Sequence, residues 1–208
     1  MIEISNILDI EKYLSDIDVV VFDLDDTLYS EKDYVKSGFL AVASKYPHIK
    51  DFAERMWYSF KNGKKPIDTI LSEENLLSEK NNCLTIYRMH FPSISLYDGV
   101  LSMIKRLKKK KKMAIITDGR PESQRAKIEA LNISKYFDKI IITDEISGIE
   151  CRKPNPISFS ILKEFFDCNY NQMVYVGDNI DKDFIAPEQL GIKTIFFNNK
   201  DGLYYKEK

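Results

Sequence analysis

One short segment constrains this chain more than any other. In residues 20–28, VVFDLDDTL, an apolar run leads directly into three closely spaced carboxylates and a threonine. Like charges packed this closely raise one another's pKa unless a cation neutralises them. A cluster of carboxylate oxygens suits Mg²⁺. The segment therefore predicts a metal-dependent acidic site near Asp25, although by itself it can also be a turn that follows a buried strand.

Short β-rich runs alternate with helical patterns along the chain, which is typical of βα units and a parallel sheet. The predicted fold class is α/β, a Rossmann-like parallel sheet with an inserted α-helical cap. In such sheets ligands bind beyond the carboxyl ends of the strands. We therefore expect Asp23, Thr117 and Asp178, each at such an end, to share one edge of the sheet. The expected strands are Ile17–Phe22, Met113–Thr117, Lys139–Thr143, Met173–Val176 and Lys193–Phe197.

About 90 residues separate the first two expected strands, far more than a crossover requires. Helical patterns occur there, at 52–60 and 76–89, without a clear strand. We predict a helical cap at 29–97 and an α/β catalytic core formed by 1–28 and 98–208. A cap that closes over the strand ends can exclude water and select substrates. The alternative is a helical layer that only thickens the core.

The composition describes an ordinary globular protein. With 44% hydrophobic residues, 30% charged residues and a net charge of −1, it predicts no bulk attraction to nucleic acid or to membranes. The three cysteines, Cys83, Cys151 and Cys168, lack metal-ligand spacing and favour a reducing compartment. The sequence shows neither a signal-peptide pattern at its start nor a stretch that would span a bilayer, so we expect a cytoplasmic protein.

The two aspartates that follow the first strand suggest phosphoryl chemistry. A carboxylate held against Mg²⁺ can attack a phosphoryl group, which makes Asp23 a candidate nucleophile and an aspartyl-phosphate the expected intermediate. Asp25 is then the candidate for protonating the leaving oxygen and for activating water in the second step. Their spacing alone does not assign either role.

Two later segments are candidates for binding phosphate. Thr117 and Asp118 lead into a turn and a helix whose free backbone amides can hold an anion, although a simple helix cap explains the same residues. Lys153 lies in a proline-bounded loop, where its ammonium group can offset charge on phosphate and on Asp23. An exposed loop lysine is the alternative.

Two aspartates that follow the expected strand Met173–Val176 complete the candidate site. Asp178 can contribute to the metal site, and Asp183 is a candidate for orienting water or Lys153, a supporting role that metal sites usually require. Alternatively, Asp183 is only a carboxylate at the start of a helix. The basic run 108–112 is interpreted as a solvated helix end at the opposite edge of the sheet rather than as a binding site.

Taken in order, these residues resemble the haloacid dehalogenase-like superfamily, helical-cap branch. The resemblance is carried by residues 23–27, Thr117, Lys153, and 177–179 with Asp183. It implies that Asp23 is the nucleophile and Asp25 the acid/base, and that Mg²⁺ is held by Asp23, Asp178 and the backbone carbonyl of Asp25. The dehalogenases of this superfamily lack a carboxylate at the position of Asp25. Residue type suggests seven substrate contacts, for which ordinary packing or surface exposure is the alternative: Tyr29, Arg55, Trp57, Tyr58, Lys61, Arg88 and Arg120.

The expected function is Mg²⁺-dependent hydrolysis of a small phosphomonoester, such as a sugar phosphate, a nucleotide or a phospho-acid. A phosphomutase that uses the same nucleophile is an alternative. A receiver-like phosphoacceptor module is a second alternative, for which Asp144 after the third strand is the candidate acceptor. A binding protein that keeps the fold without turnover is a third.

Overall fold

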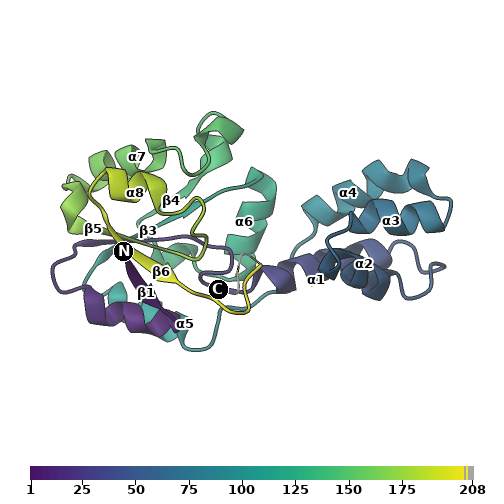
Figure 1. Cartoon of the computed structure of the whole chain (residues 1–208), viewed down its shortest axis with the longest axis horizontal. Coiled ribbons are helices and arrows are strands. Elements are labelled where there is room, and N and C mark those ends of the chain that lie inside the picture. The colour runs from purple at the N-terminus through teal and green to yellow at the C-terminus, as the bar shows by residue number, and fades with distance from the viewer. Residues whose placement is uncertain (204, 206–208) are drawn as a thin grey trace. The chain divides into compact units, whose positions relative to one another are not determined.

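A computed structural model describes residues 1–203 and 205. The chain forms two compact units, which Figure 1 shows by element. The first contains residues 1–31 and the described residues from 95 onward, and the second contains residues 32–94. A fully parallel sheet of six strands runs through the described part of the first unit, in the order β1 (Ile2–Ile4), β6 (Lys193–Phe197), β5 (Met173–Gly177), β2 (Val19–Phe22), β3 (Lys112–Thr117) and β4 (Lys139–Ile142).

The central strands are continuous apolar runs because both faces of the sheet are covered. Every residue of β2 is fully buried. Phe22 pairs in register with Ile115 of β3 and Val176 of β5, so the carboxyl ends of these three strands lie within two residues of one another. The predicted parallel α/β sheet is confirmed. The three-residue strand β1 was not predicted, because so short a run carries no recognisable period.

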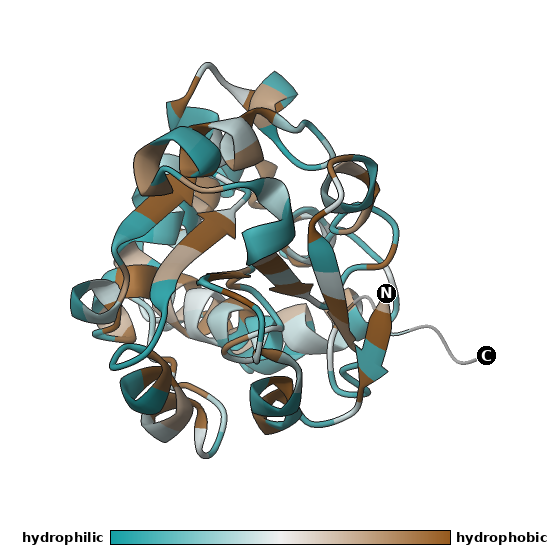
Figure 2. Cartoon of the chain, turned by 90° about the vertical axis from the view of Figure 1, so that its left-hand side faces the viewer, coloured by the Kyte–Doolittle hydropathy of each residue, from teal (hydrophilic) through white to brown (hydrophobic). Residues whose placement is uncertain are grey.

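Helices on both faces bury the sheet. Helices α7 (Ile157–Phe166) and α8 (Ile185–Gln189) cover one face, where Phe159 packs in a cluster with Val21 and Tyr175, while α5 (Val100–Leu107) lies on the other face (Figure 1). Figure 2 shows the resulting pattern, with hydrophobic strands inside and hydrophilic outer helix surfaces. The remaining elements of this unit are α6 (Pro121–Ala130) and the 3₁₀ turns Ile7–Tyr13, Ser134–Tyr136, Thr143–Glu145, Ile149–Cys151 and Tyr170–Gln172.

The helical insertion between β2 and β3 is confirmed. It contains α1 (Glu31–Ala43), α2 (Phe52–Lys61), α3 (Pro66–Glu73), a 3₁₀ turn (Leu77–Glu79) and α4 (Lys80–Met89). The insertion has its own core, which includes Phe39, Met56, Leu71 and Cys83. Its role as a cap with the boundaries 29–97 stays a prediction. Residues 204 and 206–208 of the predicted core lie outside the described residues. Among the described residues, no helix is both long and apolar enough to cross a membrane.

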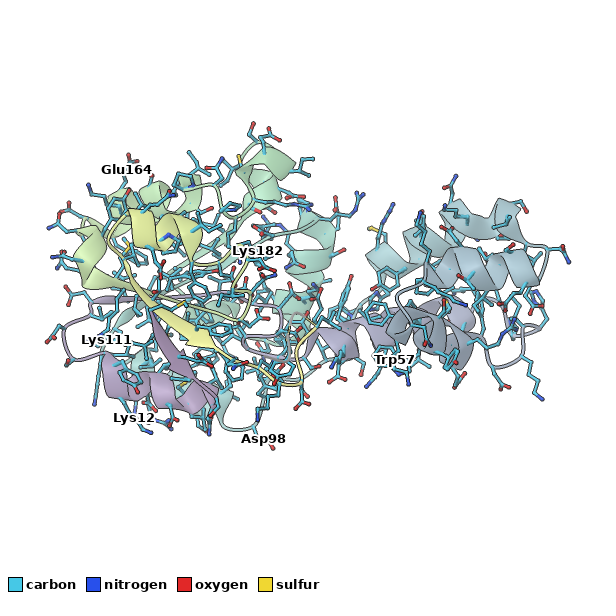
Figure 3. The ribbon with its side chains drawn as sticks, in the orientation of Figure 1. Lys12, Trp57, Asp98, Lys111, Glu164 and Lys182 are labelled. Carbon is cyan, nitrogen blue, oxygen red and sulfur yellow. The ribbon has the colours of Figure 1, made fainter. Side chains whose placement is uncertain are left out.

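The basic run 108–112 follows α5 and ends with Lys112, the first residue of β3, at the amino end of that strand. Three of its lysines are tied to neighbouring segments of the same unit. Lys108 pairs with Asp138, Lys111 donates to a backbone carbonyl, and Lys112 donates to the carbonyl of Phe166 at 3.1 Å. Figure 3 labels Lys111 at this end of the unit. These contacts anchor the run as part of the fold.

Candidate active site

The carboxyl ends of three neighbouring strands carry the candidate residues. Asp23 follows β2, Thr117 ends β3, and Asp178 follows β5. The backbone N–H of Asp23 donates to the carbonyl of Val176 at 2.8 Å, which extends the β2–β5 pairing to the nucleophile candidate itself. The topology therefore brings together side chains that are more than 150 positions apart in the sequence.

Three buried carboxylates form a cluster at this edge. Asp23, Asp178 and Asp183 each offer an oxygen within 4.8 Å of the others. Burial, opposed in part by Lys153, raises the pKa of Asp23 to about 7. Burial and the charge of Asp23 raise the pKa of Asp178 to about 9. Without a further cation Asp23 and Asp178 do not both ionise at neutral pH, so an oxygen-ligated divalent ion such as Mg²⁺ fits this donor set.

Lys153 is the cation that the fold itself supplies to the cluster. Its Nζ contacts Asp23, lies 2.8 Å from Oδ1 of Asp183 and donates to the hydroxyl of Tyr175 at 2.9 Å. Burial acts to lower the pKa of Lys153, but Asp183 and Asp23 outweigh it and hold that pKa well above the usual range. The ammonium group is therefore charged throughout the neutral range. Tyr175, on β5, is a member of the site that the sequence did not indicate.

Asp183 occupies space that Gly177 leaves open. The backbone N–H of Asn179 donates to Oδ2 of Asp183 at 3.0 Å. A Cβ atom built on Gly177 would lie 2.5 Å from that same oxygen. The absence of a side chain at position 177 therefore lets Asp183 reach both Lys153 and the backbone of the loop.

Asp25 lies in a separate group of hydrogen-bond donors. Its Oδ1 accepts from Nζ of Lys127 at 2.7 Å and from the hydroxyl of Tyr29, and its Oδ2 accepts from Nε2 of Gln124 at 2.8 Å. Burial acts to raise the pKa of Asp25, but the charge of Lys127 and the three hydrogen bonds outweigh it, and the pKa lies below its usual range. Asp25 is thus ionised here. Gln124 and Lys127 were not predicted, because their spacing on α6 is equally typical of a solvated helix face.

The two candidates on the β3 loop have different surroundings. The hydroxyl of Thr117 is buried and accepts from the amide of Gln124. The carboxylate of Asp118 accepts from the Thr143 hydroxyl at 2.9 Å, the backbone N–H of Lys153 at 3.1 Å and Nζ of Lys182, a residue labelled in Figure 3, at 3.2 Å. The Asp118 side chain therefore connects neighbouring loops by hydrogen bonds. Phosphate binding at Asp118 stays a prediction, and it would use the backbone N–H rather than the carboxylate.

The loop after Asp25 is held by residues from the end of the described chain. Asp26 has a positive φ of 52°, and its carboxylate accepts from the backbone N–H of Glu31 at 2.8 Å and of Leu203 at 2.7 Å. The amide of Asn199 donates to the backbone carbonyl of Asp26 at 2.8 Å. No sequence pattern indicates these contacts, because nothing in residues 199–203 marks them as partners of the loop that follows β2.

The suggested substrate contacts differ in their surroundings. Tyr29 is fully buried, and its hydroxyl binds Asp25. Arg55 forms ion pairs with Glu73 at 2.8 Å and Glu74 at 2.5 Å inside the helical unit. Tyr58 is 68% exposed. Substrate contact by any of the seven suggested residues stays a prediction.

Comparison with known proteins identifies the family of this chain. Residues 20–197 match the family model described as haloacid dehalogenase-like hydrolase. The match covers most of the chain, which therefore belongs to this family of hydrolases.

The chain is similar to particular members over most of its length. It is 27% identical to N-acylneuraminate-9-phosphatase of Mus musculus, covering 91% of this chain and 85% of that one. It is 26% identical to glyceraldehyde 3-phosphate phosphatase of Pyrococcus furiosus, covering 87% and 80%. The fold also matches that of the HAD-hydrolase YfnB from Bacillus subtilis, determined bound to magnesium, with a TM-score of 0.64, 16% identity and 86% coverage of each chain.

Proposed function

We propose that this protein is a Mg²⁺-dependent phosphatase that hydrolyses a small phosphomonoester through an aspartyl-phosphate on Asp23. One observation carries the proposal. Asp23 lies within a single buried cluster that contains two further carboxylates and the ammonium group of Lys153. Such a cluster combines a nucleophile, a set of metal ligands and a fixed positive charge, which are the parts that phosphoryl transfer requires.

The metal would be held by Asp23, Asp178 and the backbone carbonyl of Asp25. When bound, Mg²⁺ would neutralise the carboxylates and withdraw charge from the phosphoryl oxygens. Thr27 supports one of these ligands, because its hydroxyl lies 3.4 Å from Oδ1 of Asp178. Lys153 holds Asp23 in place and supplies the fixed positive charge beside it.

The proposed reaction proceeds in two steps. In the first, a carboxylate oxygen of Asp23 bonds to phosphorus, the bond from phosphorus to the substrate oxygen breaks, and Asp25 gives its proton to that leaving oxygen. In the second, water bonds to phosphorus, the bond to Asp23 breaks, and Asp25 takes the proton of the water. Asp25 is ionised in this structure, which is the form that the second step requires, and the proton that it then takes from water is the one that the first step of the next turnover delivers. Thr117 and Lys153 would bind the phosphoryl oxygens in both steps.

The relatives support a small substrate. Their names specify a sugar-acid phosphate and a triose phosphate, both small phosphomonoesters. The family match favours this reaction over the receiver-like alternative. A phosphomutase would use the same Asp23 chemistry but would return the phosphoryl group to the substrate, so the balance between free phosphate and isomer distinguishes the two.

Phosphate release tests the proposal. Purified protein would be supplied with Mg²⁺ and a panel of sugar phosphates, nucleotides and phospho-acids, and the parent would be compared with Asp23→Asn. We expect release that requires Mg²⁺ and is lost in Asp23→Asn. Release that persists in Asp23→Asn would overturn the assigned nucleophile, and isomer formed in excess over phosphate would favour the mutase.

A further inference from the structure

Two residues of α6, one helical turn apart, reach the carboxylate of Asp25. Gln124 and Lys127 are 2% and 4% exposed. Lysine is almost never this deeply buried unless it is paired. Nζ of Lys127 lies 2.7 Å from Oδ1 of Asp25, and Nε2 of Gln124 lies 2.8 Å from Oδ2. A polar pair on the inner face of a helix is costly to bury, which calls for an explanation beyond packing.

The donors divide unequally between the two oxygens of Asp25. An ionised carboxylate has about four acceptor positions, two on each oxygen. Oδ1 receives both Lys127 and the Tyr29 hydroxyl, whereas Oδ2 receives only Gln124 among the described residues. The open acceptor position is therefore on Oδ2.

Gln124 also connects this oxygen to the expected phosphate site. The same Nε2 that donates to Oδ2 of Asp25 donates to the hydroxyl oxygen of Thr117. Oδ2 thus shares a hydrogen-bond donor with the residue proposed to bind the phosphoryl group. Oδ1 is occupied by the ammonium group of Lys127 and a buried hydroxyl.

We propose that Gln124 and Lys127 are positioning residues that hold Asp25 so that the proton passes through Oδ2 to the leaving oxygen and from water. The inference rests on the proposed phosphatase reaction. It assigns to α6 a role in that reaction, because two of its side chains act on Asp25. The position of α6 after the β3 loop does not by itself require such a role. If the pair only neutralised a buried charge, its loss would weaken folding without distinguishing one substrate from another.

Leaving groups distinguish these two roles. An alkyl phosphate releases an alkoxide that requires a proton, whereas 4-nitrophenyl phosphate releases a phenolate that is stable without one. The ratio kcat/KM reports steps only through the first cleavage of the phosphorus–oxygen bond, so the shared second step does not contribute. Dividing the alkyl value by the nitrophenyl value also cancels any difference in the folded fraction of a variant.

The experiment compares Lys127→Met and Gln124→Leu with the parent and with Arg125→Met. Arg125 lies on the same helix, but its side chain is 68% exposed and pairs with Glu145, so its substitution changes the charge of α6 without reaching Asp25. We expect the alkyl-to-nitrophenyl ratio of kcat/KM to fall at least about tenfold in each of the first two variants and to stay unchanged in Arg125→Met.

Equal losses on both substrates, or no loss, would overturn the positioning role while leaving the phosphatase intact. If Lys127→Met fails to fold, the ratio measured for Gln124→Leu tests the positioning role. This substitution removes a neutral donor and leaves the ion pair between Lys127 and Asp25 in place. A parent protein that releases phosphate from neither substrate nor from the wider panel would overturn the proposed function, and this inference with it.

Discussion

Nζ of Lys153 lies 2.8 Å from Oδ1 of Asp183, in an ion pair whose side chains are 2% and 0% exposed. The same ammonium group contacts Asp23. One buried cation therefore stands between the proposed nucleophile and a carboxylate of the neighbouring loop. Breaking a buried pair by removing one partner is strongly destabilising, because it leaves an uncompensated charge.

Lys153→Met should damage both folding and activity. Removing the ammonium group leaves Asp23 and Asp183 without their shared partner, so we expect a loss of about 3 kcal/mol in the free energy of unfolding. We also expect kcat to fall at least about 100-fold, because a fixed positive charge beside the reacting group is lost. Urea unfolding and steady-state phosphate release measure the two effects.

Lys105→Met is the matched control, since Lys105 is exposed and lies on α5, which carries none of the cluster residues. It should leave both quantities unchanged. A Lys153→Met protein with nearly the parent kcat would contradict the assigned role of Lys153.

Gly177→Ala should displace Asp183. The added Cβ would lie 2.5 Å from Oδ2 of Asp183, so we expect a loss of about 1–3 kcal/mol in the free energy of unfolding. The same substitution made in an Asp183→Ala background should cost less, because the clashing carboxylate is gone. A double-mutant cycle in urea measures this difference. If Gly177→Ala lowers the free energy of unfolding equally in the parent and in Asp183→Ala, the loss does not come from a clash with Asp183.

The sheet was predictable because buried parallel strands are continuous apolar runs. The same reasoning predicted that the ends of β2, β3 and β5 meet, since parallel strands share a carboxyl edge. The donors to Asp25 were not predictable in this way. Whether Gln124 and Lys127 face inward depends on how α6 packs, and a glutamine and a lysine at this spacing usually lie in solvent.

Some contacts depend on the tertiary structure alone. In the sequence, Tyr175 is one residue of an apolar run that predicts a buried strand. In the structure its hydroxyl contacts Lys153 and Asp183. Asn199 reaches the loop at Asp26 from the far end of the chain. No local pattern encodes such partners, because they depend on which strand ends and loops become neighbours after folding.

Mg²⁺ should stabilise the folded protein through the acidic cluster. A cation that binds the native carboxylates shifts the folding equilibrium by mass action, so the melting temperature should rise with Mg²⁺ and fall again on chelation. Asp178→Asn removes one charged ligand and should reduce this rise. Thermal unfolding across a Mg²⁺ titration measures it, with Asp181→Asn, a change outside the cluster, as the control. An equal rise in Asp178→Asn would count against Asp178 as a ligand.

Asp138 should contribute stability that depends on pH. Burial acts to raise the pKa of Asp138, but a hydrogen bond from Lys108 and the backbone N–H of Met113 outweigh it and lower that pKa. Because the folded-state pKa lies below that of the unfolded chain, the contribution is complete above about pH 4 and is lost as the pH falls through the folded value. The pair is partly exposed, so Asp138→Asn should cost no more than about 1 kcal/mol at neutral pH.

Urea unfolding at several pH values checks this prediction. The difference between the parent and Asp138→Asn should shrink as the solution is acidified below about pH 4. Glu129→Gln, an exposed change of equal charge, is the control. A difference that stays constant with pH would show that the carboxylate charge of Asp138 does not stabilise the fold.

The most direct test of the central claim is to trap the covalent intermediate. Protein turning over a substrate that it hydrolyses would be quenched in acid, digested and analysed by mass spectrometry for a phosphoryl group. The account predicts phosphorylation of the peptide that contains Asp23 in the parent, and none in Asp23→Asn. A phosphoryl group on another residue, or phosphate release by Asp23→Asn at the parent rate, would contradict Asp23 as the nucleophile.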